Sequence, residues 1–120
     1  MIEKVNLTEK FALFAEQWSP KIAGEVNDSL VKLVKFRGDF VWHKHETEDE
    51  MFFVVKGSIT IRLRDGDVQL GEGEFVIIPR GVEHKPYAEE EAHVLLFEPK
   101  TVLNTGDVVN ERTRPVLERI

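Results

Sequence analysis

Short apolar segments separated by glycine and proline constrain the fold of this chain more than any other feature. Residues 30–36, 50–56, 75–78 and 94–97 are rich in Val, Ile, Leu and Phe, and residues 59–63 alternate apolar with polar side chains. Runs of this length, bounded by turn residues, are typical of β-strands. Roughly eight such segments, in a chain long enough for one core, predict a single all-β domain. An antiparallel sandwich or small jelly-roll barrel is the expected architecture.

The N-terminal stretch has a different pattern and predicts one short helix. Phe11, Phe14, Ala15 and Trp18 follow the spacing of one helical face, so we expect a helix over residues 7–18. Its start can be capped by Asn6 or Thr8, and Ser19-Pro20 would end it. The expected organisation is one domain: an arm and helix (1–28), a barrel (29–100) and a C-terminal segment (101–120).

The segment at residues 50–56 suggests an assembly. Met51, Phe52, Phe53, Val54 and Val55 follow one another without a polar residue, so both faces of this strand are expected to be buried. One face can line the barrel interior, and a second subunit is the simplest cover for the other. A homodimer is therefore expected.

Charge and cysteine content exclude several classes of function. The formal net charge is −6 and the pI is about 5.2, so the chain should repel nucleic acids and anionic membranes. No cysteine is present, which leaves only nitrogen and oxygen atoms as metal ligands. The N-terminus lacks the pattern of a signal peptide, and no apolar run approaches the roughly 20 residues that span a bilayer. A soluble, cytoplasmic protein is expected.

Three histidines and a glutamate have the spacing of a metal site. His43 and His45 lie on a predicted strand over residues 40–45, where alternation puts both on one face, about 6.6 Å apart. Glu50 begins the next strand after an acidic loop, and His84 comes from a separate hairpin. Imidazole and carboxylate ligands suit one divalent transition metal ion such as Zn, Fe, Mn, Ni or Cu. A His-x-His pair alone more often faces solvent, and the added carboxylate and third histidine make that reading less attractive here.

Apolar residues near these ligands are candidates for the wall of a pocket. Val41, Phe52 and Val54 share the inward parity of their strands. Tyr87, the single tyrosine, can hydrogen-bond a substrate or simply pack as an aromatic side chain. Lys32 and Lys35 lie on opposite faces of one strand, so at most one can reach an acidic substrate in the pocket.

The complete pattern resembles the cupin superfamily, in the form of a small single-domain cupin similar to mannose-6-phosphate isomerase-like members. The first cupin motif is matched by Gly38, His43, His45, Glu50 and Gly57, with four residues instead of the common five before His43. The second motif is matched by Gly73, Pro79, Gly81 and His84, and Ala88 replaces its final asparagine.

This resemblance implies a double-stranded β-helix, a metal held by His43, His45, Glu50 and His84, and a dimer as the common assembly. It also implies a metal-dependent enzyme acting on a small polar metabolite, either a sugar or sugar-phosphate isomerase or a simple dioxygenase. The alternative is a non-catalytic module in which the metal anchors a small-molecule ligand. Sequence alone does not choose between them.

Overall fold

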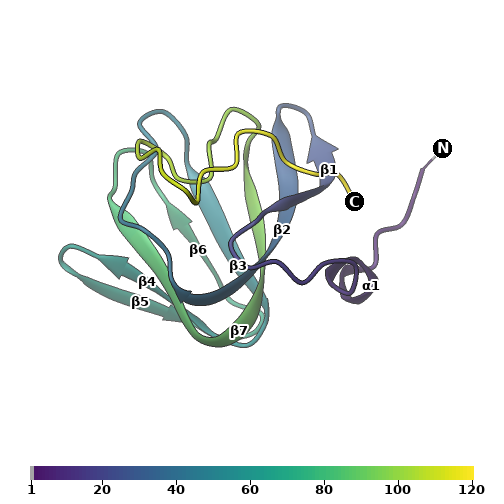
Figure 1. The fold of residues 1–120 in the computed structure, drawn as a ribbon, viewed down its shortest axis with the longest axis horizontal. Coiled ribbons are helices and arrows are strands. Elements are labelled where there is room, and N and C mark those ends of the chain that lie inside the picture. Colours follow the sequence, from purple (N-terminus) through teal and green to yellow (C-terminus); the bar gives the residue numbers. More distant parts are fainter. Residues whose placement is uncertain (1) are drawn as a thin grey trace.

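One long strand joins the two halves of the barrel. The computed structural model describes residues 2–120, and in it strand β7 (His84–Pro99) pairs with three other strands (Figure 1). Its first half pairs with β4 (Ile59–Leu63) and its second half with β3 (Glu50–Lys56). Strand β2 (Ser29–Asp39) follows β7 along most of its length, with an irregularity between Phe36 and Gly38.

Three shorter strands complete the sheet. Strand β1 (Lys21–Val26) pairs with β2, β5 (Gly66–Leu70) with β4, and β6 (Phe75–Ile78) with β3, all antiparallel. The order is β1-β2-β7-β3-β6, with β4 and β5 branching from β7. The prediction of an all-β antiparallel barrel with one short N-terminal helix is therefore confirmed. Within residues 2–120, no helix is long and apolar enough to pass through a membrane.

Strand alternation explains how the core forms. Phe52 and Val54 point into the barrel and are 2% and 0% exposed, whereas Met51, Phe53 and Val55 point outward and stay half-buried. Burying a side chain of this size contributes about 1.5–3 kcal/mol. The expectation that both faces of this strand would be buried thus holds only for the inner face within one chain.

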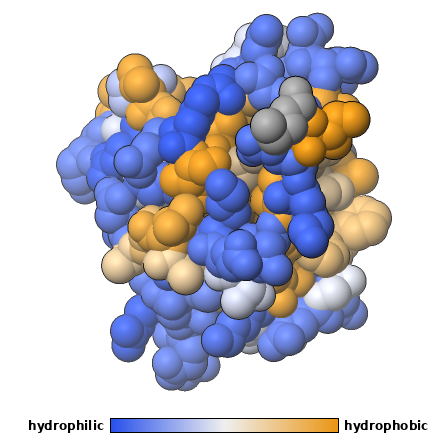
Figure 2. Space-filling view, turned by 90° about the vertical axis from the view of Figure 1, so that its right-hand side faces the viewer, coloured by the Kyte–Doolittle hydropathy of each residue, from blue (hydrophilic) through white to orange (hydrophobic). Residues whose placement is uncertain are grey.

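The outer face of β3 continues into an exposed apolar surface. Phe75 and Ile77 of β6, which pair with Phe53 and Met51, are 57% and 54% exposed. Figure 2 shows the side of the molecule that carries the N-terminus, where hydrophobic residues lie between hydrophilic ones.

The predicted N-terminal helix is too long. Helix α1 (Leu7–Phe11) starts as expected, because the Asn6 side chain accepts a hydrogen bond from the Glu9 amide at 2.9 Å. It ends after Phe11, and the chain then crosses the sheet without helical structure. Trp18 has a φ of 58°, which a right-handed α-helix does not permit, and its ring stacks on Phe36 and Phe40. The helix-like spacing of aromatic residues therefore reflects separate contacts along an irregular path.

Two other predictions need correction. Strand β1 lies inside residues 1–28, which we expected to form only an arm and a helix, so the sheet begins earlier than predicted. Residues 40–45 do not form a continuous strand; in this stretch His43 makes an isolated bridge to His84.

The C-terminal segment crosses one end of the barrel (yellow in Figure 1). Its irregular path is held by internal hydrogen bonds, including one of 2.7 Å between the hydroxyls of Thr105 and Thr113. Its last residue returns to β1, where the Ile120 amide donates to the Ile22 carbonyl at 3.0 Å.

Candidate metal centre

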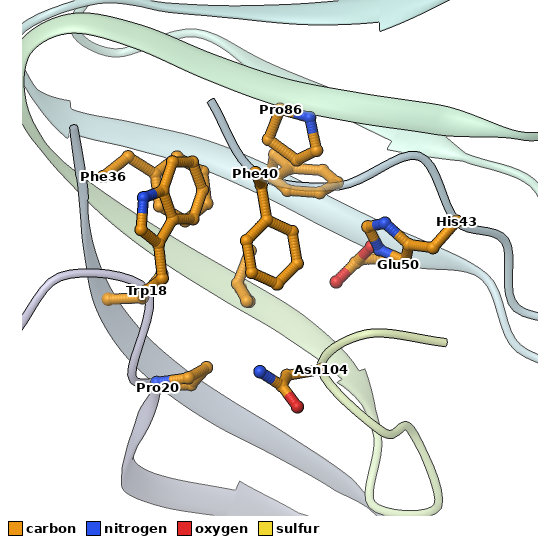
Figure 3. Close-up of a pocket in the computed structure, with 11 residues that line it drawn as sticks. Trp18, Pro20, Phe36, Phe40, His43, Glu50, Pro86 and Asn104 are labelled. Atoms are coloured by element: carbon orange, nitrogen blue, oxygen red, sulfur yellow. The ribbon is translucent and has the colours of Figure 1, made fainter. Parts of the chain in front are cut away.

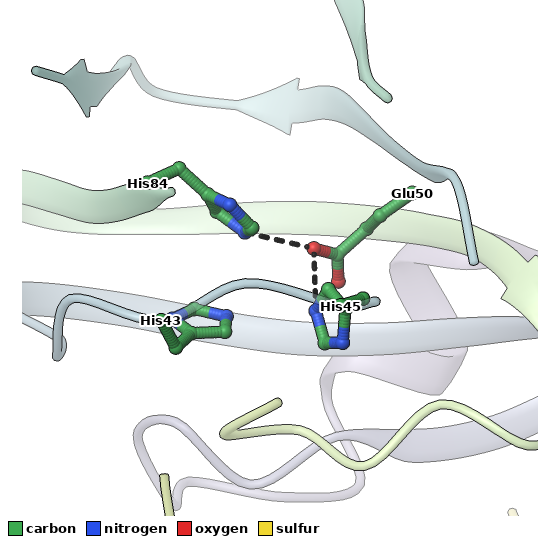
Figure 4. Close-up of side chains that lie close together, drawn as sticks. All are labelled: His43, His45, Glu50 and His84. Atoms are coloured by element: carbon green, nitrogen blue, oxygen red, sulfur yellow. Dashed lines mark hydrogen bonds and ion pairs between the residues drawn. The ribbon is translucent and has the colours of Figure 1, made fainter. Parts of the chain in front are cut away.

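The four predicted ligands meet inside the barrel. His43, His45, Glu50 and His84 each offer a ligand atom, and these atoms all lie within 4.8 Å of one another (Figure 4). The four residues are between 0% and 5% exposed. The Glu50 Oε1 atom lies 3.2 Å from His84 Nε2 and 3.3 Å from His45 Nε2.

Two of these residues are positioned by strands and two by a loop. Glu50 is the first residue of β3 and His84 the first residue of β7. His43 and His45 belong to the segment between β2 and β3. Backbone bonds fix this segment: His43 and His84 exchange amide-to-carbonyl bonds of 3.0 and 2.9 Å, and the Gly81 amide donates to the His45 carbonyl at 2.8 Å.

Backbone carbonyls hold the Nδ1 atoms of two imidazoles, so Nε2 is the atom that each ring can offer to a metal. The Nδ1 atom of His43 is 2.8 Å from the Val41 carbonyl, and that of His84 is 2.9 Å from the Val82 carbonyl. A carbonyl only accepts, so each Nδ1 carries a proton, and the neutral form of such a ring has its lone pair on Nε2. Such a backbone partner is the usual support of a metal-binding histidine.

His45 gives the direct test of whether the cluster suits a metal. Its Nε2 is buried without a hydrogen-bond partner, since its 3.3 Å contact with Glu50 lacks hydrogen-bond geometry. A buried polar atom without a partner is costly, and a metal ion would satisfy it. The donor set therefore fits one divalent transition metal bound through nitrogen and oxygen.

The charge states of the site also suit metal binding. Burial, reinforced by the nearby His84, lowers the pKa of His43 to about 4. Burial opposes ionisation of Glu50, but the imidazoles of His45 and His84, close to its Oε1, hold the pKa of this carboxyl well below its usual range. At neutral pH the site therefore presents a neutral His43 and a carboxylate, the forms that a metal needs.

A second buried carboxyl lies beside the ligands and was not assigned a role from the sequence. Glu98 of β7 is 2% exposed, and its Oε1 accepts from Lys32 Nζ at 2.8 Å. Burial and the neighbouring Glu50 raise the pKa of Glu98 well above its usual range. In the sequence, Glu98 is the first residue of a polar stretch that follows the last apolar strand, which gives no hint of a role at the site. One feature could have pointed to a buried partner: Lys32 lies at an inward-facing position of β2.

A narrow apolar cavity adjoins the ligands (Figure 3). Its volume is about 20 Å³, room for roughly one water molecule. His43 and Glu50 reach it at one end, and Asn104 enters from the C-terminal segment. Apolar side chains form the rest of the wall: Trp18, Pro20, Val34, Phe36, Phe40, Phe52, Pro86 and Leu96.

The candidate pocket residues are distributed over three places. Phe52 lines the cavity, Val54 lies in the core, and Val41 packs against that core. Tyr87 lies in a separate groove between β4, β5 and β7, with the Arg62 guanidinium 4.7 Å from its ring.

The C-terminal segment contacts the loop that carries His43 and His45. The Lys44 amide donates to Asp107 Oδ1, and the Asp107 amide donates to the Lys44 carbonyl, both at 3.0 Å. Gly106 lies so close that a Cβ atom on it would overlap the Lys44 carbonyl oxygen and come within 3.0 Å of the His43 ring.

Comparison with known families agrees with this geometry. Residues 30–99, which are more than half of the chain, match the model of the cupin domain. The chain belongs to the cupin family. The matched range includes all four candidate ligands, the residue pair Lys32 and Glu98, and most of the barrel.

Other proteins resemble this chain over different lengths. A cupin-2 domain protein from Shewanella frigidimarina is 47% identical, with a TM-score of 0.79, over 80% of this chain and 94% of that one. An uncharacterised Bacillus subtilis protein, YdbB, is 37% identical over 51% of this chain and 55% of its own. A Saccharolobus solfataricus protein whose name proposes a dioxygenase is 26% identical over 87% of this chain. This chain spans only 28% of the latter protein and about half of YdbB, 55%.

Proposed function

We propose that this cupin is a metal-dependent dioxygenase that acts on a small molecule with an apolar body. The observation that carries the proposal is the apolar cavity that opens on His43 and Glu50. A ligand there would place a polar end at the metal and its body against aromatic rings. The similarity to the S. solfataricus protein, named as a proposed dioxygenase, supports the same reaction class.

The cavity wall favours this substrate class over a sugar phosphate. Among the described residues, those that line the cavity include no lysine or arginine. Lys32 points inward, but its ammonium group is paired with Glu98. Lys35 points outward and donates to the Phe14 carbonyl at 2.6 Å. A phosphate group in the cavity would therefore have no free lysine or arginine to share its charge with the metal, which makes its burial costly.

The residues of the chain would bind and enclose the reactants. His43, His45, Glu50 and His84 would hold the metal, which when bound supplies Lewis-acid and redox chemistry. The aromatic wall would exclude water and orient the substrate. The acidic loop before Glu50 also contains Glu48, but its carboxylate accepts a hydrogen bond from Thr101 at 2.6 Å on the exposed surface, so we do not propose it as a base.

Oxygen consumption tests the proposal. Metal-free protein would be reloaded with Fe²⁺ or Mn²⁺ without air and mixed with oxygen and a substrate panel. The panel compares small aromatic or aliphatic compounds bearing two adjacent oxygen donors with sugar phosphates. We expect oxygen uptake with the apolar-bodied compounds and none with the His84→Ala variant.

Two other results would replace the proposal. Sugar-phosphate isomerisation without oxygen uptake would show an isomerase. Saturable binding of the same compounds without turnover, with every metal tested, would show a ligand-binding module.

We also propose that the protein is a homodimer and works in the cytoplasm. The exposed Phe75 and Ile77, together with the half-buried Met51 and Phe53, form a continuous apolar surface on paired strands. A second copy of the chain would cover it. Replacing Phe75 and Ile77 by Lys should yield a monomer in sedimentation experiments; an unchanged mass would place any dimer contact elsewhere.

A further inference from the structure

An ion pair is buried inside the barrel where apolar residues would serve stability equally well. The side chains of Lys32 and Glu98 are each 1% exposed, and their charged atoms are 2.8 Å apart. They are diagonal neighbours across β2 and β7, since Leu30 pairs with Glu98 and Lys32 pairs with Leu96. Removing two charges from water costs several kcal/mol per ion, and a well-packed apolar pair is often as stable. Stability alone therefore does not account for this pair.

Glu98, one member of the pair, lies next to the candidate metal ligand Glu50. Met51 of β3 pairs with Phe97 of β7 in antiparallel register, so Glu50 and Glu98, one position beyond this pair, lie next to each other on the two strands. Both side chains are buried on the inner face of the barrel, at 4% and 2% exposure, so Glu50 and Glu98 are cross-strand neighbours there.

The two oxygens of Glu98 have different surroundings. Oε1 accepts a hydrogen bond from Lys32. Oε2 is buried, and no group in residues 2–120 donates a hydrogen bond to it. Lys32 thus fixes Glu98, and Glu98 lies beside Glu50 across the β3–β7 pair. Glu50 Oε1 faces His45 and His84.

We propose that Glu98, held by Lys32, is a positioning residue that sets the orientation of the Glu50 carboxylate at the metal. This inference rests on the metal site of the proposed function. Hydrogen-bonding partners of metal ligands typically contribute about 10- to 100-fold to metal affinity. The two residues belong to the site without contacting the metal.

Cobalt binding tests the proposal, because Co²⁺ reports both affinity and ligand geometry through its visible spectrum. The main variant is K32M/E98L, which replaces the whole pair by apolar side chains and leaves no buried charge alone. We expect it to fold, to bind Co²⁺ about 10- to 100-fold more weakly, and to show a shifted spectrum. E98Q should restore the affinity and spectrum nearly to wild type, since its amide can donate to Glu50 and accept from Lys32.

Lys35→Met is the matched control. Lys35 lies three residues from Lys32 on the same strand, is 9% exposed and is hydrogen-bonded, but it points away from the metal site. We expect a loss of stability without any change in the cobalt spectrum. If K35M shifts the spectrum as much as K32M/E98L, the effect is general and the proposal is overturned.

The remaining outcomes are also decisive. Wild-type affinity and spectrum in a folded K32M/E98L variant would overturn the positioning role. If that variant does not fold, Glu98→Asp, which keeps the charge but withdraws it from Glu50, must lower Co²⁺ affinity for the role to stand. Failure of the wild-type protein to bind Co²⁺ would instead reject the metal site and with it the proposed function.

Discussion

The metal ligands are supported in two different ways within one site. Glu50 and His84 begin strands β3 and β7, which are anchored in the sheet by many backbone hydrogen bonds. His43 and His45 lie on an irregular loop, and this loop is held by a bridge to His84 and by contacts with Gly106 and Asp107. The comparison indicates that the strand pair depends on the barrel, whereas the loop pair depends on the C-terminal segment.

The largest expected effect is the loss of a ligand borne by a strand. Replacing His84 by Ala should reduce metal affinity more than about 100-fold, since a ligand should matter more than its outer partners. The barrel should persist, because most of β7 pairs beyond residue 84. Metal titration monitored by calorimetry measures this. His93→Ala is the matched control: His93 also lies on β7 but stacks on Phe11 outside the cluster, so it should retain wild-type affinity.

The loop ligand His43 should make the metal-free protein sensitive to acid. Its folded pKa is about 4, below the unfolded value of about 6.5, so the unfolded state binds more protons between these values. Stability should therefore fall as the pH drops from about 6.5 to 4, by up to about 3 kcal/mol for this residue. Urea unfolding at several pH values measures the slope. His43→Gln should flatten it; an equally steep slope in that variant would assign the acid sensitivity to other groups.

The contact between the C-terminal segment and the loop can be strained directly. Gly106 has a φ of 57° and no space for a Cβ atom, whereas Gly38 has a φ of 77° and open space around it. Both Ala variants carry the same kind of backbone strain, but only Gly106→Ala adds overlap with Lys44. We expect Gly106→Ala to cost about 1–3 kcal/mol more in thermal or urea unfolding, and to weaken metal binding. Equal losses in the two variants would show that the segment does not constrain the loop.

The smallest expected effect concerns one hydrogen bond at the same contact. Asp107→Ala removes the acceptor of the Lys44 amide, which should cost about 1 kcal/mol because the site is exposed to water. Metal affinity should decrease by less than in Gly106→Ala. Asp65→Ala, in the turn between β4 and β5, is a control at an exposed aspartate far from the loop in the sequence.

The ligands could be predicted from the sequence because their spacing is encoded locally. Strand alternation and the spacing of the motif glycines were enough to predict that His43, His45, Glu50 and His84 meet, although His43 and His45 lie on a loop and not on a strand. The role of Glu98 beside Glu50 could not be predicted in the same way. Lys32, which holds Glu98, is 66 residues away in the sequence, and the two meet only through the β2–β7 register. A register of this kind depends on the whole barrel.

The N-terminal part shows the opposite situation. The aromatic spacing of residues 7–18 was compatible with a helix, but tertiary contacts determined the path: Trp18 stacks on Phe36 and Phe40, and Phe14 lies against the Lys35 ammonium. The local sequence pattern cannot reveal that tertiary contacts override the helical tendency, because these contacts are made by residues of distant strands. Strand β1 was missed because Gly24 and Asn27-Asp28 resemble turn residues.

The size of the cavity has a consequence for the kinetics of ligand entry. A space of about 20 Å³ admits little more than a water molecule, and its wall includes Pro20 and Asn104, on opposite ends of the chain. A larger ligand can enter only while the segment that contains Pro20 or the segment that contains Asn104 has moved away from the cavity. The observed association rate should therefore level off at high ligand concentration, at the rate of that opening, and the plateau would measure how often the barrel exposes its interior.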